Sequence, residues 1–258
     1  MLPKKKKNYD IINDEWRYFM IKVTNLCKSF GEKIAVDNLN FVVPSGKIVG
    51  FIGPNGAGKS TTLKMMTGIL QPTKGNIELN GYDIGRQSVL AKKQFGIVFD
   101  SPDNFLGLKG IEYLILISKI YEVDQTNILT KINELAKVFK LDMELNNLIS
   151  SYSHGMRQKI MIIGCLIHSP SIWLLDEPLT GLDPESALVL KNLMKQHAQE
   201  GNTVLFSTHV LEVAEKLCDE IIIINQGQLM YQGTLTNLQN KYPNLSLEDI
   251  FFKVISNE

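Results

Sequence analysis

The sequence predicts an α/β fold built on a mostly parallel β-sheet with helices on both faces. From Ser171 onward, apolar runs typical of buried strands alternate with helical segments: strand 171–176, helix 184–199, strand 203–207, helix 210–217 and strand 220–225. This alternation is typical of parallel strands joined by crossover helices. Apolar residues make up 44% of the 258 residues and charged residues 21%, which is the balance of an ordinary soluble globular protein.

The N-terminal half predicts further strands and the first helix. Alternating apolar and polar residues from Ile21 predict a half-buried strand. Apolar runs predict two more strands on either side of a turn, then a helix and a short strand. Longer helices are expected in the middle of the chain, and two short helices around Pro243. The ranges are strands 38–43, 47–53 and 75–79, the turn 44–46, and helices 59–69, 109–139 and 155–167.

Net charge and cysteine content narrow the classes of protein to which this chain can belong. The formal net charge is +0, which argues against a nucleic-acid binder that relies on a general positive field. Residues 1–19 form a predicted polar tail. Its basic run, Lys4–Lys7, is either solvated or attracted to an anionic membrane surface. Three scattered cysteines, no apparent signal peptide and no apolar run long enough to span a bilayer predict a chain that works in the cytoplasm.

One glycine-rich segment carries the clearest chemical signal. Residues Gly53–Ser60 fit the pattern G-x-x-x-x-G-K-S between an apolar strand and a helix, which is the context of a phosphate-binding loop. The glycines let backbone N–H groups converge on the β-phosphate of a nucleotide, Lys59 reaches the β- and γ-phosphates, and Ser60 offers a hydroxyl to Mg²⁺. The alternative is a glycine-rich turn without a ligand. The predicted contacts are Gly53, Pro54, Asn55, Gly56, Ala57, Gly58, Lys59, Ser60 and Thr61.

Two acids and a histidine follow predicted strands further along the chain. Asp176 and Glu177 close the run IWLLDE. The first can hold Mg²⁺, and the second can activate the water that attacks the γ-phosphate. His209, just past the strand TVLFS, is placed to donate a hydrogen bond to the γ-phosphate. The alternatives are a solvated strand end and an ordinary loop histidine.

A second helix start also resembles an anion site. In SSYSHGMRQKI, Ser150–Ile160, small polar residues and a glycine precede helix-forming residues. The first N–H groups of a helix lack partners, and its dipole favours negative charge. The chain therefore has two candidate sites for a nucleotide phosphate, the phosphate-binding loop and this second helix start.

With the phosphate-binding loop, this second helix start and the acids in this order, residues from about 20 to 233 resemble the nucleotide-binding subunit of an ABC transporter. The resemblance implies a P-loop NTPase (RecA-like) fold with a mostly parallel sheet core, an antiparallel β portion and a helical sub-domain. The expected divisions are a tail at 1–19, an ABC ATPase domain at 20–235 with its helical sub-domain at about 103–168, and a short helical extension at 236–258.

The resemblance also implies an arrangement of two subunits. Two such chains, identical or related, would hold two ATP molecules head to tail, and Ser153 and Gly155 of one chain would bind the γ-phosphate held by the other. Asp183 would lie in the loop through which the subunits contact each other. Phe30 would stack on adenine, a contact that needs only a flat aromatic face. The alternative for Phe30 is a core aromatic residue at a strand end.

Two departures from the family pattern bear on function. Tyr152, His154 and Met156 differ from the commonest signature, Leu-Ser-Gly-Gly-Gln, and resemble a variant of exporter ATPases of the drug and antimicrobial-peptide type. Asp100 stands where the family has a glutamine. It is either a Mg²⁺ ligand or an exposed acid that faces the membrane partner.

The sequence thus predicts an ATPase that binds ATP and Mg²⁺ and powers an ABC transporter, with export favoured. Its expected partners are a second nucleotide-binding subunit, with a homodimer favoured, and separate integral membrane subunits on the cytoplasmic face of the membrane, without nucleic acid. One alternative is a soluble ABC ATPase that acts on ribosomes or nucleic acid. Another is a structural subunit that binds ATP without hydrolysing it.

Overall fold

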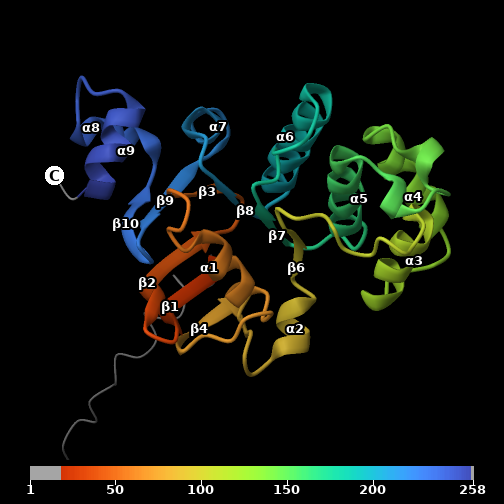
Figure 1. Ribbon diagram of the computed structural model, residues 1–258, viewed down its shortest axis with the longest axis horizontal. Coiled ribbons are helices and arrows are strands. Elements are labelled where there is room, and N and C mark those ends of the chain that lie inside the picture. Colours follow the sequence, from red (N-terminus) through yellow and green to blue (C-terminus); the bar gives the residue numbers. More distant parts are fainter. Residues whose placement is uncertain (1–18, 257–258) are drawn as a thin grey trace, which may run out of the picture.

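The computed structural model describes residues 19–256 (Figure 1). The predicted polar tail, including Lys4–Lys7, lies outside the described residues, apart from Phe19, which begins the first strand. No helix in the described part of the chain is long and apolar enough to cross a membrane.

A six-stranded sheet forms the centre of the molecule. Neighbouring strands are parallel, except that the edge strand β10 runs antiparallel to β9. The predicted strands at 171–176, 203–207 and 220–225 are therefore confirmed as β7, β8 and β9. In spatial order the strands are β10 (Gln228–Gly233), β9 (Glu220–Asn225), β3 (Ile48–Ile52), β8 (Thr203–Thr208), β7 (Ile172–Asp176) and β6 (Phe95–Val98).

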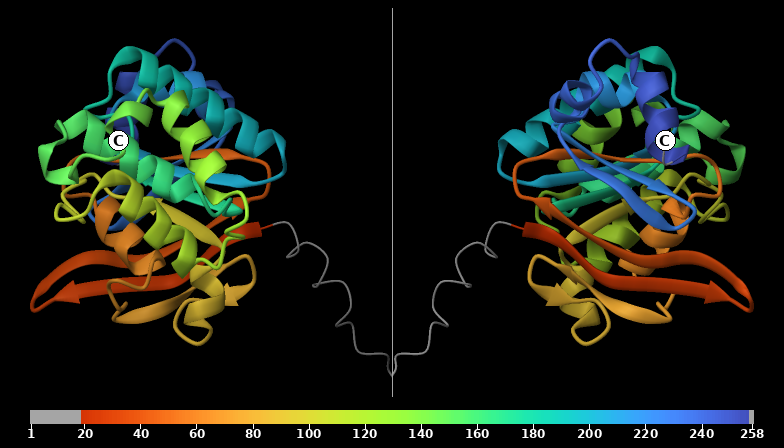
Figure 2. Two further views of the ribbon diagram at one scale, coloured as in Figure 1. Left: turned by 90° about the vertical axis from the view of Figure 1, so that its right-hand side faces the viewer. Right: turned by 90° about the vertical axis from the view of Figure 1, so that its left-hand side faces the viewer.

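One face of this sheet is covered mainly by a second, antiparallel sheet and by α1 (Figure 2). The expectation of helices on both faces therefore holds only in part, because long strands replace most of the helical layer here. This apolar contact forms one core, with Phe51, Leu174 and Leu205 facing Leu26 and Leu63. Its elements are β2 (Lys33–Pro44), β1 (Phe19–Phe30), β4 (Lys74–Leu79), β5 (Tyr82–Asp83), α1 (Lys59–Met66) and α2 (Ser88–Lys92).

Helices cover the opposite face and extend into a lobe, seen at the right of Figure 1. The lobe is built by α3, α4 and α5, with two short 3₁₀ turns between α4 and α5. The helix that the sequence predicts at 109–139 is wrong in its middle. It breaks at Glu122, whose φ is +56°, and at Asp124, whose carboxylate accepts the Thr126 N–H. The elements are α3 (Gly110–Ile120), α4 (Ile128–Val138), α5 (His154–Leu166) and α6 (Pro184–Gln199).

The C-terminal residues form two helices beside β9 and β10. The two short helices expected around Pro243 are confirmed as α8 (Leu235–Lys241) and α9 (Leu247–Ser256). Together with α7 (Leu211–Leu217) they bury a small apolar cluster that includes Leu238 and Ile250.

Candidate active site

The predicted site residues gather at the carboxyl ends of β3, β7 and β8. These strands are parallel neighbours, so the segments that follow them meet at one edge of the sheet. A cleft of about 980 Å³ opens there, within the size of a ligand pocket. Most of the predicted phosphate-binding loop lines it, together with Phe30, Asp100 and Glu177. Lys33, Asp37 and Gln226 also line the cleft, and no sequence motif pointed to them.

Two glycines of the loop are required by its surroundings. A Cβ on Gly58, whose φ is +105°, would lie 2.7 Å from the Ala35 carbonyl oxygen. A Cβ on Gly53 would overlap the Ile224 carbonyl oxygen. Gly56 has room for a Cβ, but its φ of +83° favours glycine. The loop is thus a backbone cradle that closes against β2 and β9, and α1 begins directly after it at Lys59.

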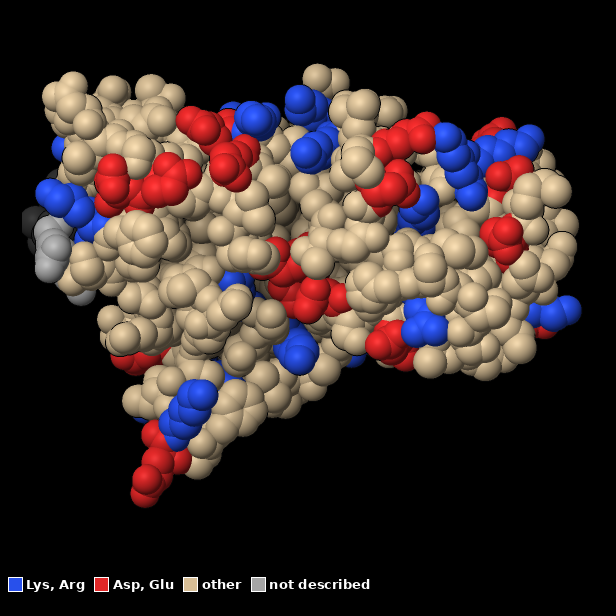
Figure 3. All heavy atoms as spheres, turned by 45° about the horizontal axis from the view of Figure 1, so that its top comes forward, with Lys and Arg blue, Asp and Glu red and all other residues tan. Residues whose placement is uncertain are grey.

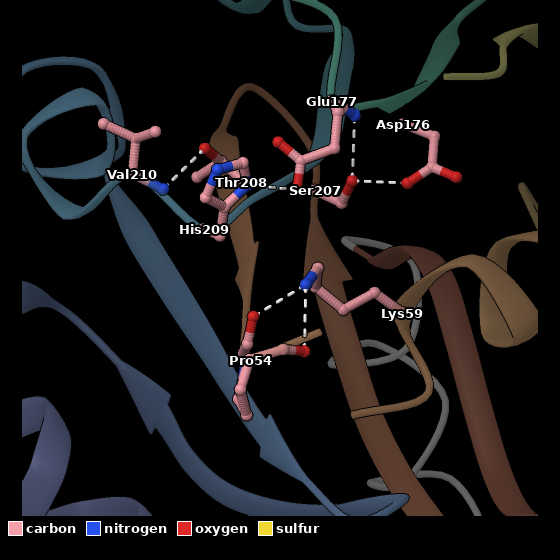
Figure 4. A network of polar contacts seen from close by, with 9 residues as sticks. Pro54, Lys59, Asp176, Glu177, Ser207, Thr208, His209 and Val210 are labelled. Carbon is pink, nitrogen blue, oxygen red and sulfur yellow. Dashed lines mark hydrogen bonds and ion pairs between the residues drawn. The ribbon is translucent and has the colours of Figure 1, made fainter. Parts of the chain in front are cut away.

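Lys59 is buried in the wall of this cradle. Its Nζ donates to the carbonyl oxygens of Gly53 at 2.6 Å and Pro54 at 3.3 Å (Figure 4). Burial lowers the pKa of Lys59, while the nearby carboxylates of Glu177 and Asp176 act in the opposite direction. A buried cation held by two neutral carbonyls has no ion-pair partner within the described residues, and a phosphate in the cradle would supply one.

Glu177 lines the same cleft as Lys59, Asp176 is buried directly before it in the chain, and one serine joins the two acids. Ser207 Oγ donates to Asp176 Oδ1 at 2.6 Å and accepts the Glu177 N–H at 2.9 Å. His209 Nδ1 lies 2.9 Å from Glu177 Oε1, at hydrogen-bond distance. The structure therefore brings Asp176, Glu177 and His209 together as one network (Figure 4). Ser207 did not emerge from the sequence, because β8 carries three hydroxyl residues, Thr203, Ser207 and Thr208, and nothing in the chain order distinguishes them.

Phe30 contributes an aromatic face to the cleft. Phe30 is 51% exposed and lines the cleft. The alternative that Phe30 is a core residue is therefore wrong. Lys28 Nζ lies 5.1 Å from the centre of its ring, so an ammonium covers part of this side chain.

Ser153, Gly155 and Asp183 do not line this cleft. Ser153 caps α5, because its Oγ accepts the Met156 N–H at 3.3 Å. A Cβ on Gly155 would lie 2.7 Å from the Gly181 carbonyl oxygen. Asp183 caps α6 and forms an ion pair with Lys159 Nζ at 2.7 Å. Hydrogen bonds from Lys159 and Ser186 lower the pKa of Asp183.

Contacts with α5 therefore hold the loop that precedes α6. His154, at the start of α5, likewise packs against Gly181 of this loop.

The residues expected to hold Mg²⁺ provide oxygen atoms of the kind that this ion prefers. Ser60 is exposed in the cleft wall, and the Asp176 carboxylate lies at the end of β7 with one oxygen used by Ser207. These two residues fit the ion. Asp100 is also exposed in the wall. Within residues 19–256, however, no three His, Cys, Asp or Glu side chains cluster as a metal site, so Mg²⁺ ligation by Asp100 stays a prediction.

Known proteins are similar to this chain in both sequence and fold. The family model of the ABC transporter matches residues 36–180, more than half of the chain. The ABC transporter ATP-binding protein NatA of Bacillus subtilis is 33% identical over 90% of this chain and 96% of its own. The Nod factor export ATP-binding protein I of Rhizobium leguminosarum is 34% identical over 83% of this chain and 68% of its own.

Solved structures of ATP-binding subunits have a similar fold, in agreement with the sequence comparison. The structure of the ATP-binding subunit of an ABC transporter superposes with a TM-score of 0.86 at 30% identity, over 91% of this chain and 99% of that one. A dimeric ATP-binding cassette in a post-hydrolysis state with ADP and Pi superposes with a TM-score of 0.75 at 25% identity, over 84% and 99%. The chain therefore belongs to the ATP-binding subunits of the ABC transporter family, and it is an ATPase with their P-loop NTPase fold.

Proposed function

We propose that this chain powers an exporter as a head-to-tail dimer on the cytoplasmic face of a membrane, together with separate integral membrane subunits. Two features support export: the signature variant at Tyr152, His154 and Met156, and a relative whose name is that of an export protein. The dimeric form of a structural neighbour supports the dimer.

The observation that carries this proposal is the separation of the two phosphate-binding features. The cleft contains the phosphate-binding loop and Glu177, whereas Ser153 and Gly155 lie at the start of α5 outside it. Figure 1 shows α5 well away from α1. A helix N-terminus with a serine cap suits an anion, and we assign this anion to the γ-phosphate of ATP bound to the partner subunit.

The proposed chemistry divides the work among the residues of the network. Glu177 accepts a proton from the attacking water, and His209 holds the Glu177 side chain at 2.9 Å. Lys59 neutralises charge on the β- and γ-phosphates. Ser60 and Asp176 would hold Mg²⁺, which supplies positive charge beside the phosphates. Phe30 is assigned to stacking on adenine, and Asp183 to the contact between subunits.

The helical lobe is the proposed dock for the membrane partner. In this proposal the ATPase domain spans about 20–235, with the lobe at about 103–168, and the last two helices form a short extension. Asp100 precedes the lobe directly in the chain. If the partner moves the lobe, the movement would therefore be transmitted to Asp100 in the cleft wall.

Replacement of Ser153 tests the trans arrangement. We expect Ser153→Arg to leave ATP binding by the isolated chain nearly unchanged, because Ser153 does not line the cleft. It should abolish the ATP-dependent dimer, because a long side chain would occupy the place of the partner's γ-phosphate. Ser151→Arg, an exposed site two residues earlier, is the matched control. Loss of ATP binding by monomeric Ser153→Arg would contradict the proposal, and sedimentation with a fluorescent nucleotide measures both quantities.

A soluble ABC ATPase that acts on ribosomes or nucleic acid is the second candidate. Acidic and basic side chains alternate on the face drawn in Figure 3, without a large basic area. The net charge of +0 is likewise unfavourable for phosphate-backbone binding. A tagged chain should co-purify with integral membrane proteins in detergent. Recovery with ribosomes or nucleic acid instead would favour the second candidate.

A further inference from the structure

Ser207 occupies the point where the two acids of the site meet. It lies on β8, is fully buried, and pairs with Asp176 of β7 in the register of the sheet. Its hydroxyl contacts both acids, at Asp176 Oδ1 and at the Glu177 N–H (Figure 4). This buried hydroxyl therefore makes one hydrogen bond as a donor and one as an acceptor, and both go to the proposed catalytic acids.

The direction of the two bonds follows from the number of protons. A serine hydroxyl has one proton and accepts through its oxygen. Because the Glu177 N–H is a donor, the oxygen of Ser207 accepts that bond, and its proton is directed at Asp176 Oδ1. One carboxylate oxygen is thereby fixed, and within residues 19–256 no side chain or backbone hydrogen bond is found at Oδ2. Ser207 thus orients Asp176 with one oxygen available to a cation.

The second bond holds an unfavourable backbone conformation. Glu177 has a φ of +48°, in the left-handed region that L-residues other than glycine rarely adopt. The bond to Ser207 fixes its N–H at this turn. Two residues further along the same segment, His209 contacts the Glu177 carboxylate at 2.9 Å. The segment 207–209 therefore holds Glu177 at its backbone and at its side chain.

We propose that Ser207 is a positioning residue for ATP hydrolysis, whose hydroxyl sets the orientation of both the cation-binding acid and the general base. This inference rests on the proposed roles of Asp176 and Glu177. The simpler reading is that β8 needs only a small side chain at this position. The two readings differ in what happens when the oxygen alone is removed, because alanine fills almost the same volume.

Removal of the hydroxyl is tested with Ser207→Ala in the full chain. We expect kcat to fall about tenfold or more, since two buried hydrogen bonds are lost, with little change in the binding of ATP without a divalent cation. The affinity of the nucleotide complex for Mn²⁺, measured by electron paramagnetic resonance, should fall several-fold. This second readout does not depend on turnover. Ser207→Thr, which keeps the hydroxyl, should restore most of both quantities.

The matched control is Thr203→Val on the same strand. Thr203 is also fully buried, and its hydroxyl donates to the Pro44 carbonyl oxygen at 2.9 Å. This variant loses a buried hydrogen bond of β8 at the other end of the strand and should retain kcat and Mn²⁺ affinity within about twofold. Equal kcat and Mn²⁺ affinity in Ser207→Ala and Thr203→Val would overturn the proposal.

Two further variants keep the outcome clear. If Ser207→Ala proves too unstable to assay, Ser207→Cys keeps a weak donor, and turnover between that of wild type and zero is expected. Wild-type turnover in Ser207→Cys would then overturn the proposal. Glu177→Gln is measured in parallel. Normal turnover in that variant would refute the proposed catalytic roles themselves, whereas an inactive Glu177→Gln beside a normal Ser207→Ala would refute only the role of Ser207.

Discussion

Replacement of Glu177 by glutamine isolates the loss of a base from the loss of structure. The side chain is 16% exposed, and its Oε1 lies 2.9 Å from His209 Nδ1. A glutamine carbonyl can accept the same hydrogen bond, and the bond from the residue-177 N–H to Ser207 belongs to the backbone. Both contacts of the network should therefore persist in Glu177→Gln, and ATP binding should remain near the wild-type value.

The expected change lies in turnover. General-base catalysis contributes typically about 10²–10⁴-fold, which raises the free-energy barrier by about 2.7–5.4 kcal/mol. Phosphate release at saturating ATP and Mg²⁺ measures this fall in kcat. Because ATP is then bound but not consumed, the ATP-dependent dimer should become visible in sedimentation.

A control shows that the effect belongs to the site. Glu215→Gln makes the same chemical change at an exposed position on α7 and should leave turnover unchanged. Normal turnover of Glu177→Gln would refute its assignment as the base. Parallel loss of ATP binding would also refute the reasoning, because it would mean that the carboxylate holds the cleft together.

Two other predictions concern Asp100 and His197. Titration of Mg²⁺ at fixed ATP should show weaker apparent affinity in Asp100→Gln if the carboxylate is a ligand; an unchanged curve with lost transport would place Asp100 at the membrane interface instead. Burial lowers the pKa of His197 to about 4, so between about pH 6.5 and that value the unfolded chain binds a proton that the folded chain does not. The free energy of unfolding should therefore fall as the pH drops through this window, by at most about 1.4 kcal/mol per pH unit from this group. His197→Phe keeps an aromatic ring against Trp173 and should make that fall shallower in urea unfolding at pH 7 and 5. An equal fall in the free energy of unfolding between pH 7 and pH 5 in wild type and His197→Phe would contradict this prediction.

Local sequence patterns predicted those helices and strands whose limits are marked by residues close to them in the chain. The strands and helices from β7 to β9 are bounded by clear changes of periodicity, and Asp183 marks the start of α6 by capping it. The break at Glu122 was missed, because the apolar pattern continues on both sides while a left-handed residue interrupts the helix. The short strand β6 was missed as well. Gly96 inside it is explained only by tertiary contact, since a Cβ there would overlap the Cys165 sulfur.

The order of strands in space explains which parts of the site the sequence could reveal. Asp176 and Lys59 belong to motifs whose meaning is contained in a few consecutive residues. The contact between Ser207 and Asp176 depends instead on β8 lying next to β7, and their separation of 31 residues gives no hint of this neighbourhood. Asp37 and Gln226 reach the cleft from segments 189 residues apart, because the Asp37 N–H bonds the Gly227 carbonyl oxygen and so joins β2 to the turn after β9. A motif thus identifies the groups that touch phosphate, whereas the groups that orient them emerge only when the sheet is assembled.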